Sequence, residues 1–233
     1  LPEKRRGDAG IGADSVRAEL DAIARVADTH GAWILSDEVY RGAELDGQET
    51  ASMWGRSERA IVTSGLSKAY GLPGLRIGWV VAPPALVESF WAYHDYVTIA
   101  PGALNDRLAR VAMAPGRRAR LIERTRDILR ANLPMMEEWL RADGGFHWIR
   151  PEAGAIIYAR YDHPINSTEL VTRLRVEKSV LVVPGDHFGM DGYLRLGFGE
   201  PQEYNRAGLG RLHDLLSSLG PIPAGGRSAS SIA

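Results

Sequence analysis

Hydrophobic and polar positions in the first third of the chain follow two different periods. Across residues 13–30 the apolar side chains recur at the spacing of an amphipathic helix, and Gly31 suits its C-terminal end. Short, mostly apolar runs then follow, at residues 32–36, 60–64 and 77–82. A helix followed by unbroken apolar strands is typical of a parallel α/β sheet.

The pattern of apolar positions changes after the first third of the chain. Helical spacing recurs in three stretches, at residues 84–96, 103–113 and 117–142. After about Leu140, short strands are predicted at residues 146–149, 155–160, 180–183 and 193–198, and helices at residues 167–178 and 202–219. We therefore predict part of a large domain in residues 1–135 and a smaller α+β domain in residues 136–220. The tail, residues 221–233, is rich in proline, glycine and serine and is expected to be disordered.

Composition and charge narrow the classes of function. Hydrophobic residues make up 45% of the 233 residues, so the chain can bury a substantial core. The formal net charge of −1 favours neither nucleic acid nor a membrane as a partner. The chain has no cysteine, which excludes disulfides and thiolate metal sites and is compatible with the cytoplasm. It begins with Leu1 and its first methionine is Met53, so we expect a fragment of something longer.

The stretch SGLSKAYGLPGLRIGW, residues 64–79, holds one lysine at the mouth of a glycine-rich turn. Lys68 follows a predicted strand, so its amine is expected at the end of the sheet where open α/β folds bind ligands. Arg76 and the hydroxyls of Ser64 and Ser67 are suited to hold a phosphate. An amine for a carbonyl group and a cradle for a phosphate together predict pyridoxal phosphate. The alternative is a lysine in a solvated surface loop.

The stretch SDEVY, residues 36–40, adds a carboxylate at the end of the first predicted strand. A buried Asp37 needs a partner, and a protonated pyridine nitrogen is one that keeps the cofactor ring an electron sink. The phenol of Tyr40, three residues later, can bond the ring's 3-oxygen. The alternative is a helix-capping aspartate followed by a tyrosine of the core.

A late arginine, Arg195, lies inside the apolar run YLRLGFG, residues 193–199. An arginine in such a strand requires an anion, and the carboxylate of a substrate is a natural one. A structural salt bridge is the alternative.

The chain resembles the class I/II aminotransferases in the order of its motifs. Asp-x-x-Tyr comes first, then Ser-Lys with Gly-x-Arg, and then a late arginine in a strand. These are fold-type I enzymes that use pyridoxal phosphate. The resemblance extends over about residues 13–219, and the stretch around Lys68 is its most specific part. It implies an α/β fold with a three-layer, mostly parallel sheet in an incomplete large domain, plus a smaller C-terminal α+β domain.

The resemblance also implies a role for each of these residues. Lys68 would form a Schiff base with the cofactor and then move a proton, while Asp37 pairs with the pyridinium nitrogen and Tyr40 with the 3-oxygen. Arg76 would hold the phosphate, and Arg195 the α-carboxylate of the amino acid. The reaction would move the amino group of an α-amino acid to a 2-oxo acid. The full-length protein would be a homodimer.

Three features depart from the family pattern. The family has a serine three residues before the lysine, and its hydroxyl helps to hold the phosphate. This chain has Gly65 at that position, so Ser64 and Ser67 would supply the hydroxyl. The family's Asn-Pro-x-Gly element matches residues 9–12, AGIG, which lack the asparagine. The family's chain also continues before Leu1, and that part supplies the segment that stacks on the cofactor ring.

Other interpretations stay open at this point. A lyase, synthase or cyclase of the same fold would use the same lysine, aspartate and arginine. An inactive remnant or a cofactor-sensing regulatory domain would not be an enzyme. His187 has no partner at metal-ligand spacing, so no metal is assigned. The eight arginines between residues 107 and 130 are interpreted as a solvated helix face.

Overall fold

We describe residues 13–220 from a computed structural model of the chain. The predicted disordered tail and the AGIG stretch without its asparagine lie outside these residues. The chain divides into two compact units, and the boundary between Arg126 and Asp127 falls inside the long helix α4 (Pro115–Asp143). The domain end expected near residue 135 stays a prediction.

The first unit contains a three-stranded sheet in the order β1-β2-β3. Its strands are β1 (Ile34–Asp37), β2 (Ala60–Gly65) and β3 (Gly78–Val81). β1 pairs with β2 in parallel, whereas β3 runs antiparallel to β2. The sheet that the sequence predicted to be mostly parallel thus contains one parallel and one antiparallel pair among the described residues. Only a turn with a short 3-10 helix, η1 (Pro73–Leu75), links β2 to β3, and a parallel return would need a longer crossover.

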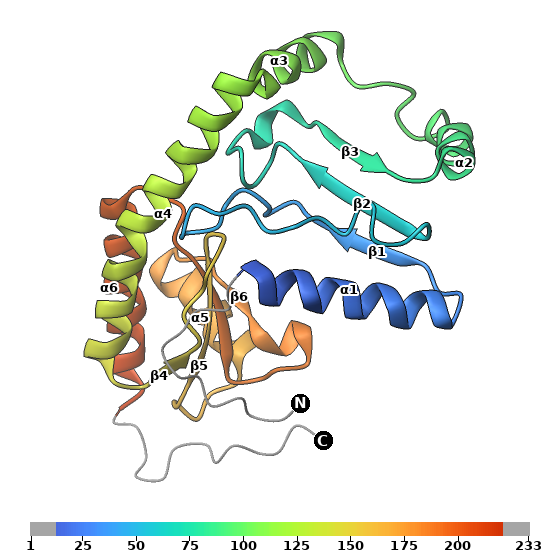
Figure 1. Cartoon of the computed structure of the whole chain (residues 1–233). Coiled ribbons are helices and arrows are strands. Elements are labelled where there is room, and N and C mark those ends of the chain that lie inside the picture. Colours follow the sequence, from blue (N-terminus) through green and yellow to red (C-terminus); the bar gives the residue numbers. More distant parts are fainter. Residues whose placement is uncertain (1–12, 221–233) are drawn as a thin grey trace. The chain divides into compact units, whose positions relative to one another are not determined.

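Helix α1 (Ala13–Thr29) runs alongside β1 and covers one face of this sheet (Figure 1). Its Ala24 belongs to a buried cluster with Met53, Ala60 and Val62. On the opposite face Leu35 is 70% exposed. The mostly apolar run 32–36 is therefore covered on only one side of the strand, because β1 has a single neighbouring strand and a helix on one face among the described residues.

Helices α2 (Pro84–His94) and α3 (Ala103–Met113) follow β3 and lead to α4. The predicted bounds of α3 agree with the structure, and α4 begins two residues earlier than predicted. Across residues 13–220, no helix is both long and apolar enough to cross a membrane.

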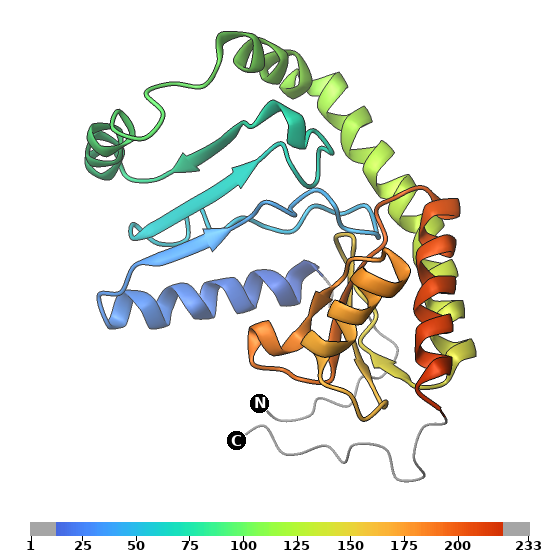
Figure 2. The same ribbon diagram turned by 180° about the vertical axis from the view of Figure 1, so that it is seen from behind.

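The second unit is built on a four-stranded sheet in the order β4-β5-β7-β6. Its strands are β4 (Phe146–Trp148), β5 (Ile156–Tyr161), β6 (Val183–Pro184) and β7 (Tyr193–Gly197). The helices of this unit are α5 (Ser167–Lys178) and α6 (Gln202–Ser218), and a 3-10 turn, η2 (Gly185–Phe188), follows β6. Figure 2 shows α6 beside the C-terminal half of α4, where Gln202 donates to the Ala131 carbonyl at 2.8 Å.

One face of this second sheet forms the core of the unit. Alternate residues of β5 and β7 are fully buried there, including Ile157, Ala159, Leu194 and Leu196. The strand predicted at residues 180–183 is largely absent, since only Val183 and the following residue are extended. The reason is local: the end of α5 turns through a left-handed residue and the next amide bonds back to the helix, which removes it from the ladder.

Candidate functional site

The carboxyl ends of the two parallel strands meet at one edge of the first sheet. Asp37 is the last residue of β1 and pairs in register with Thr63 of β2, which ends two residues later at Gly65. Asp37 is exposed, and one of its carboxylate oxygens accepts a hydrogen bond from the Val39 amide at 3.1 Å. The turn that carries Lys68 begins directly after Gly65, so the aspartate and the lysine-bearing turn leave the sheet at the same edge.

Hydrogen bonds join these two segments directly. The Glu38 amide donates to the Thr63 carbonyl at 2.8 Å, and the Ser64 hydroxyl donates to the Glu38 carbonyl at 3.2 Å. The Ala69 amide, next to Lys68, donates to the Val39 carbonyl at 3.5 Å. The backbone on both sides of the lysine is thereby held against the Asp37–Tyr40 segment.

Lys68 is an exposed residue between buried neighbours. Leu66 and Ala69 are 0% exposed and Tyr70 is 4% exposed, whereas the lysine faces solvent. The Gly71 amide donates to the Lys68 carbonyl at 2.9 Å and closes the turn. The side chains that flank Lys68 are packed in the core, so they fix the backbone of the turn. Lys68 therefore differs from a lysine in a loose surface loop.

The turn returns to the sheet through a close contact between two glycines. Gly65 and Gly78 are register partners, and a Cβ on Gly65 would lie 3.1 Å from the Ile77 carbonyl oxygen. The glycine at the position of the serine in the family pattern thus avoids a tight contact between β2 and the backbone before β3. Arg76 lies just before, in the left-handed region at φ 51°, and its guanidinium donates to the Pro73 carbonyl at 3.0 Å.

Tyr40, Ser64 and Ser67, the other predicted cofactor contacts, are half-buried and belong to the same two segments. Arg76 lies further along the same turn, just before β3, and the assignment of these residues to a cofactor stays a prediction. Arg195 belongs to the second unit and is described there.

An ion pair that the sequence did not predict, between Arg118 and Glu49, lies beside Tyr70, two positions after Lys68. The Arg118 guanidinium donates to both carboxylate oxygens of Glu49, at 2.7 and 2.9 Å, and its Nε donates to the Tyr70 hydroxyl at 3.1 Å. The hydrogen bonds from Arg118 lower the pKa of Glu49, and the bond to Glu49 in turn raises the pKa of Arg118. Arg124, one helical turn and a half further on, donates to the Tyr70 carbonyl at 3.1 Å.

The interpretation of the α4 arginines as a solvated face is therefore wrong for part of the set. Arg126 is 7% exposed and lies 3.4 Å from Glu44, a carboxylate that also accepts from the amides of Gly42 and Thr50. The partners of Arg118 and Arg126 lie 69 and 82 residues away along the chain, so local spacing carried no signal for them.

Glu38 is a second residue that sequence reasoning missed. One of its carboxylate oxygens accepts from the Ser52 hydroxyl at 2.8 Å and from the Met53 amide at 2.9 Å. These bonds fasten the segment next to Asp37 to the loop that leads into β2. An acidic residue directly after the predicted aspartate was the only available signal.

Arg195 lies on the half-buried face of β7, opposite Tyr158 of β5. No carboxylate among residues 13–220 forms an ion pair with Arg195, which weighs against the structural salt bridge. The Tyr158 hydroxyl oxygen is buried without a hydrogen-bond partner in the described part of the chain. The Tyr158 ring stacks on Tyr193 at 5.1 Å, and burial, Tyr193 and Asp186 raise the pKa of Tyr158, so it stays a donor at neutral pH.

The loop between β6 and β7 is held by Asp186. Its carboxylate accepts from the Thr168 hydroxyl at 2.8 Å and from the Asn166 amide at 3.2 Å. These and a bond from Ser167 lower the pKa of Asp186 to about 2. His187 beside it joins no metal-binding group, since the described residues contain no cluster of three His, Cys, Asp or Glu side chains suited to a metal.

Comparison of the chain with known proteins assigns it to a family. The family model for aminotransferase class I and II matches residues 10–212. The chain belongs to the class I and II aminotransferases. The cofactor of this family is pyridoxal phosphate, and the mixed helix and strand architecture is that of a fold-type I fragment.

Individual relatives agree with this assignment. The chain is similar to a capreomycidine synthase of Streptomyces vinaceus, with 35% identity over 162 residues, which are 69% of this chain and 41% of that protein. It is also similar to aromatic-amino-acid aminotransferase 2 of Thermococcus litoralis, with 29% identity over 212 residues, which are 88% of this chain and 54% of that protein. A PLP-dependent aminotransferase from Streptococcus suis superposes with a TM-score of 0.81 at 33% identity, over 88% of this chain and 54% of that one. The chain spans about half the length of these relatives.

Proposed function

We propose that this chain carries the lysine-bearing part of a pyridoxal-phosphate-dependent aminotransferase that moves an amino group from an α-amino acid to a 2-oxo acid. The observation that carries the proposal is the set of backbone bonds that joins the Lys68 turn to the Asp37–Tyr40 segment at one sheet edge. An amine and a carboxylate at one edge match the aldehyde and the ring nitrogen of this cofactor.

The residues at this edge fit the cofactor by their chemistry. Asp37 has one carboxylate oxygen bonded to a backbone amide, which leaves the other for a protonated ring nitrogen. The Arg76 guanidinium donates one hydrogen bond, to the Pro73 carbonyl, and its other N–H groups can bind a phosphate together with the hydroxyls of Ser64 and Ser67. Tyr40 is assigned to the ring's 3-oxygen. The bound cofactor supplies the electron sink that makes the α-proton of an amino acid acidic.

Lys68 has two tasks in this proposal. Its amine would hold the cofactor at the sheet edge by condensing with the aldehyde group, with release of water. Once an incoming amino acid had displaced the lysine, the freed Nζ would take the α-proton and deliver it to the former aldehyde carbon of the cofactor. The packed neighbours Leu66 and Ala69 keep the backbone of this base in place during both steps.

Arg195 is assigned to the α-carboxylate of the amino acid, and Tyr158 supports it. Arg195 has no ion-pair partner and the buried Tyr158 hydroxyl has no hydrogen-bond partner among residues 13–220, and the two residues pair in register on neighbouring strands. A carboxylate would satisfy both groups at once, since it accepts several hydrogen bonds.

The full-length protein is proposed to be a homodimer. The segment from α2 to the start of α3 exposes large apolar side chains, among them Tyr93, Tyr96 and Ile99 at 74%, 92% and 68%. Exposed apolar patches of this kind mark interaction surfaces. Sedimentation of the full-length protein with and without Tyr96→Asp tests it.

A synthase of the same fold is a second candidate, and the similarity to the capreomycidine synthase favours it. Both candidates use Lys68, Asp37 and Arg195, so only the fate of the amino group separates them. Incubation with ¹⁵N-labelled amino acids and a 2-oxo acid decides: label in the new amino acid supports a transaminase, and a rearranged product that keeps its nitrogen supports the synthase.

Cofactor capture by the chain tests the site itself. The chain contains only three lysines, Lys4, Lys68 and Lys178, so borohydride reduction of the complex followed by peptide mapping gives an unambiguous answer. We expect a visible absorption band and a label at Lys68, lost in Lys68→Ala and kept in Lys178→Ala. A label spread over the three lysines would contradict the proposal.

A further inference from the structure

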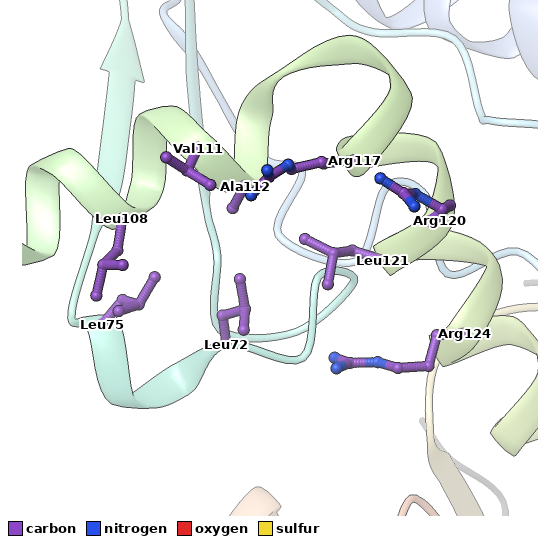
Figure 3. Close-up of a pocket in the computed structure, with 9 residues that line it drawn as sticks. All are labelled: Leu72, Leu75, Leu108, Val111, Ala112, Arg117, Arg120, Leu121 and Arg124. Carbon is purple, nitrogen blue, oxygen red and sulfur yellow. The ribbon is translucent and has the colours of Figure 1, made fainter.

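A cavity of about 530 Å³ lies in the first unit beside the turn that follows Lys68. Its apolar wall comes from three elements: Leu72 and Leu75 from the turn, Leu108 and Val111 from α3, and Leu121 from α4 (Figure 3). Its volume falls within the range of about 300–1,000 Å³ that is typical of small-molecule sites. An apolar wall of this size favours a ligand with a hydrocarbon body.

Three arginines of α4 line the same cavity. Arg117, Arg120 and Arg124 are three and four residues apart and therefore share one face of the helix. Figure 3 shows Arg124 extending from α4 toward the turn that carries Leu72, and Arg117 extending toward Ala112 of α3. The cavity thus combines an apolar wall with three cations.

These three cations have no carboxylate partner in the described part of the chain. The Arg120 Nε donates to the Gly116 carbonyl of its own helix at 3.2 Å, and Arg124 donates to backbone carbonyls of the Lys68 turn. Arg118 and Arg126 on other faces of α4 each have a glutamate partner. Among the arginines of α4, those without a carboxylate partner in the described part of the chain therefore lie on the face that lines the cavity.

The position of the arginines along α4 points to an anion independently. The helix begins at Pro115, and its first turn contains no acidic residue. The partial positive charge of a helix N-terminus favours anions and disfavours Arg117 and Arg120 there. A sequence that breaks a local rule of this kind does so most often at a functional site.

We propose that this cavity binds an amphiphilic oxyanion, a molecule with a carboxylate or phosphate head on an apolar chain. The head binds the guanidinium groups of Arg117 and Arg120, whose planar forks match the geometry of both oxyanions. The apolar chain packs against Leu72, Leu75 and Leu108. This site is separate from the proposed cofactor contacts and does not depend on them.

Calorimetric titration of the 233-residue chain with dodecanoate and with dodecyl phosphate, below their micelle-forming concentrations, tests the proposal. We expect saturable one-to-one binding of at least one of them, and the tighter of the two identifies the head group. Dodecyltrimethylammonium, with the same chain and the opposite charge, should bind at least about tenfold more weakly, as expected when a charge-assisted bond is lost. Increasing salt should weaken the binding of the anion.

Two double variants separate the site from general surface charge. Arg117→Gln/Arg120→Gln should weaken anion binding about tenfold or more while dodecanol binding persists, which also shows that the cavity is folded. Arg107→Gln/Arg110→Gln removes two exposed arginines of α3 that do not line the cavity and should change nothing. Lys68→Ala should bind the anion as the unchanged chain does, so a failure of the cofactor site is distinguishable.

The proposal would be overturned if anion binding weakened equally in both double variants, or if the cationic and anionic amphiphiles bound with equal affinity. The absence of saturable binding of either anion would overturn it as well. Sedimentation in the same buffers reports whether a second copy of the chain occupies the cavity instead. Self-association that dodecanoate does not reverse would also count against it.

Discussion

Replacing Arg118 with glutamine removes the cation that fastens α4 to the segment after Lys68. The change breaks two charge-assisted bonds to Glu49, at 2.7 and 2.9 Å, and a bond to the Tyr70 hydroxyl at 3.1 Å. Buried bonds to charged groups contribute about 1.5–3 kcal/mol each, but exposed ion pairs contribute only about 0–1 kcal/mol. The Arg118 and Glu49 side chains are 31% and 26% exposed, and Arg41 stays 3.5 Å from Glu49. We therefore expect the free energy of unfolding to fall by about 1–2 kcal/mol.

The pH dependence of this loss follows from Glu49. The hydrogen bonds from Arg118 lower the pKa of Glu49 in the folded state below its value in the unfolded chain. A lowered carboxyl pKa stabilises the fold above the unfolded pKa, and the stabilisation is lost as the pH falls through the folded pKa. The difference between the unchanged chain and Arg118→Gln should thus be full at pH 7 and shrink below about pH 4.

Urea unfolding monitored by circular dichroism provides the assay, in a double-mutant cycle of Arg118→Gln and Glu49→Gln. We expect a coupling free energy of about 1 kcal/mol between the two residues. Arg117→Gln is the matched control: it removes a neighbouring arginine without a carboxylate partner among the described residues and should change the free energy of unfolding by less than about 0.5 kcal/mol. A coupling below about 0.3 kcal/mol would refute the reasoning.

Three further changes test other parts of the structure. Asn132→Ala removes a 2%-exposed amide that donates to two carbonyls at 2.7 Å, and should lower the free energy of unfolding by about 2–4 kcal/mol in urea, with a smaller loss for the half-buried Asn105→Ala; equal losses would contradict this. The carboxylate of Asp186, with its pKa lowered to about 2, stabilises the fold above about pH 4 and loses this effect toward pH 2, so the urea midpoints of Asp186→Asn and the unchanged chain should converge at low pH rather than stay parallel. In the full-length protein Tyr158→Phe should raise the KM for the amino acid several-fold at nearly constant kcat, whereas Arg195→Gln should lower kcat/KM by about 100-fold or more; an unchanged KM in both would remove them from the carboxylate site.

Much of the local structure of this protein is predictable from its sequence. Apart from the strand predicted at residues 180–183, the helices and strands were predicted with small errors at their ends, since periodicity and glycine positions act over a few residues. The stretch around Lys68 also indicated the family, because it resembles the motif of class I/II aminotransferases, and the match to the family model confirms that assignment. Asp37 and Lys68 were expected at one edge of the sheet because the carboxyl ends of parallel strands meet there.

Other features were decided only by the tertiary structure. Periodicity identifies the apolar face of an element but not what covers it, so the 70% exposure of Leu35 and the antiparallel direction of β3 were not predictable. Charge partners are likewise set by topology. Arg118 forms an ion pair with Glu49. Arg117, its neighbour in sequence, lines a cavity and has no carboxylate partner in the described chain. Adjacent residues of a helix point about 100° apart, so only the packing of α4 on the first unit decides which arginine is paired and which is left for a ligand.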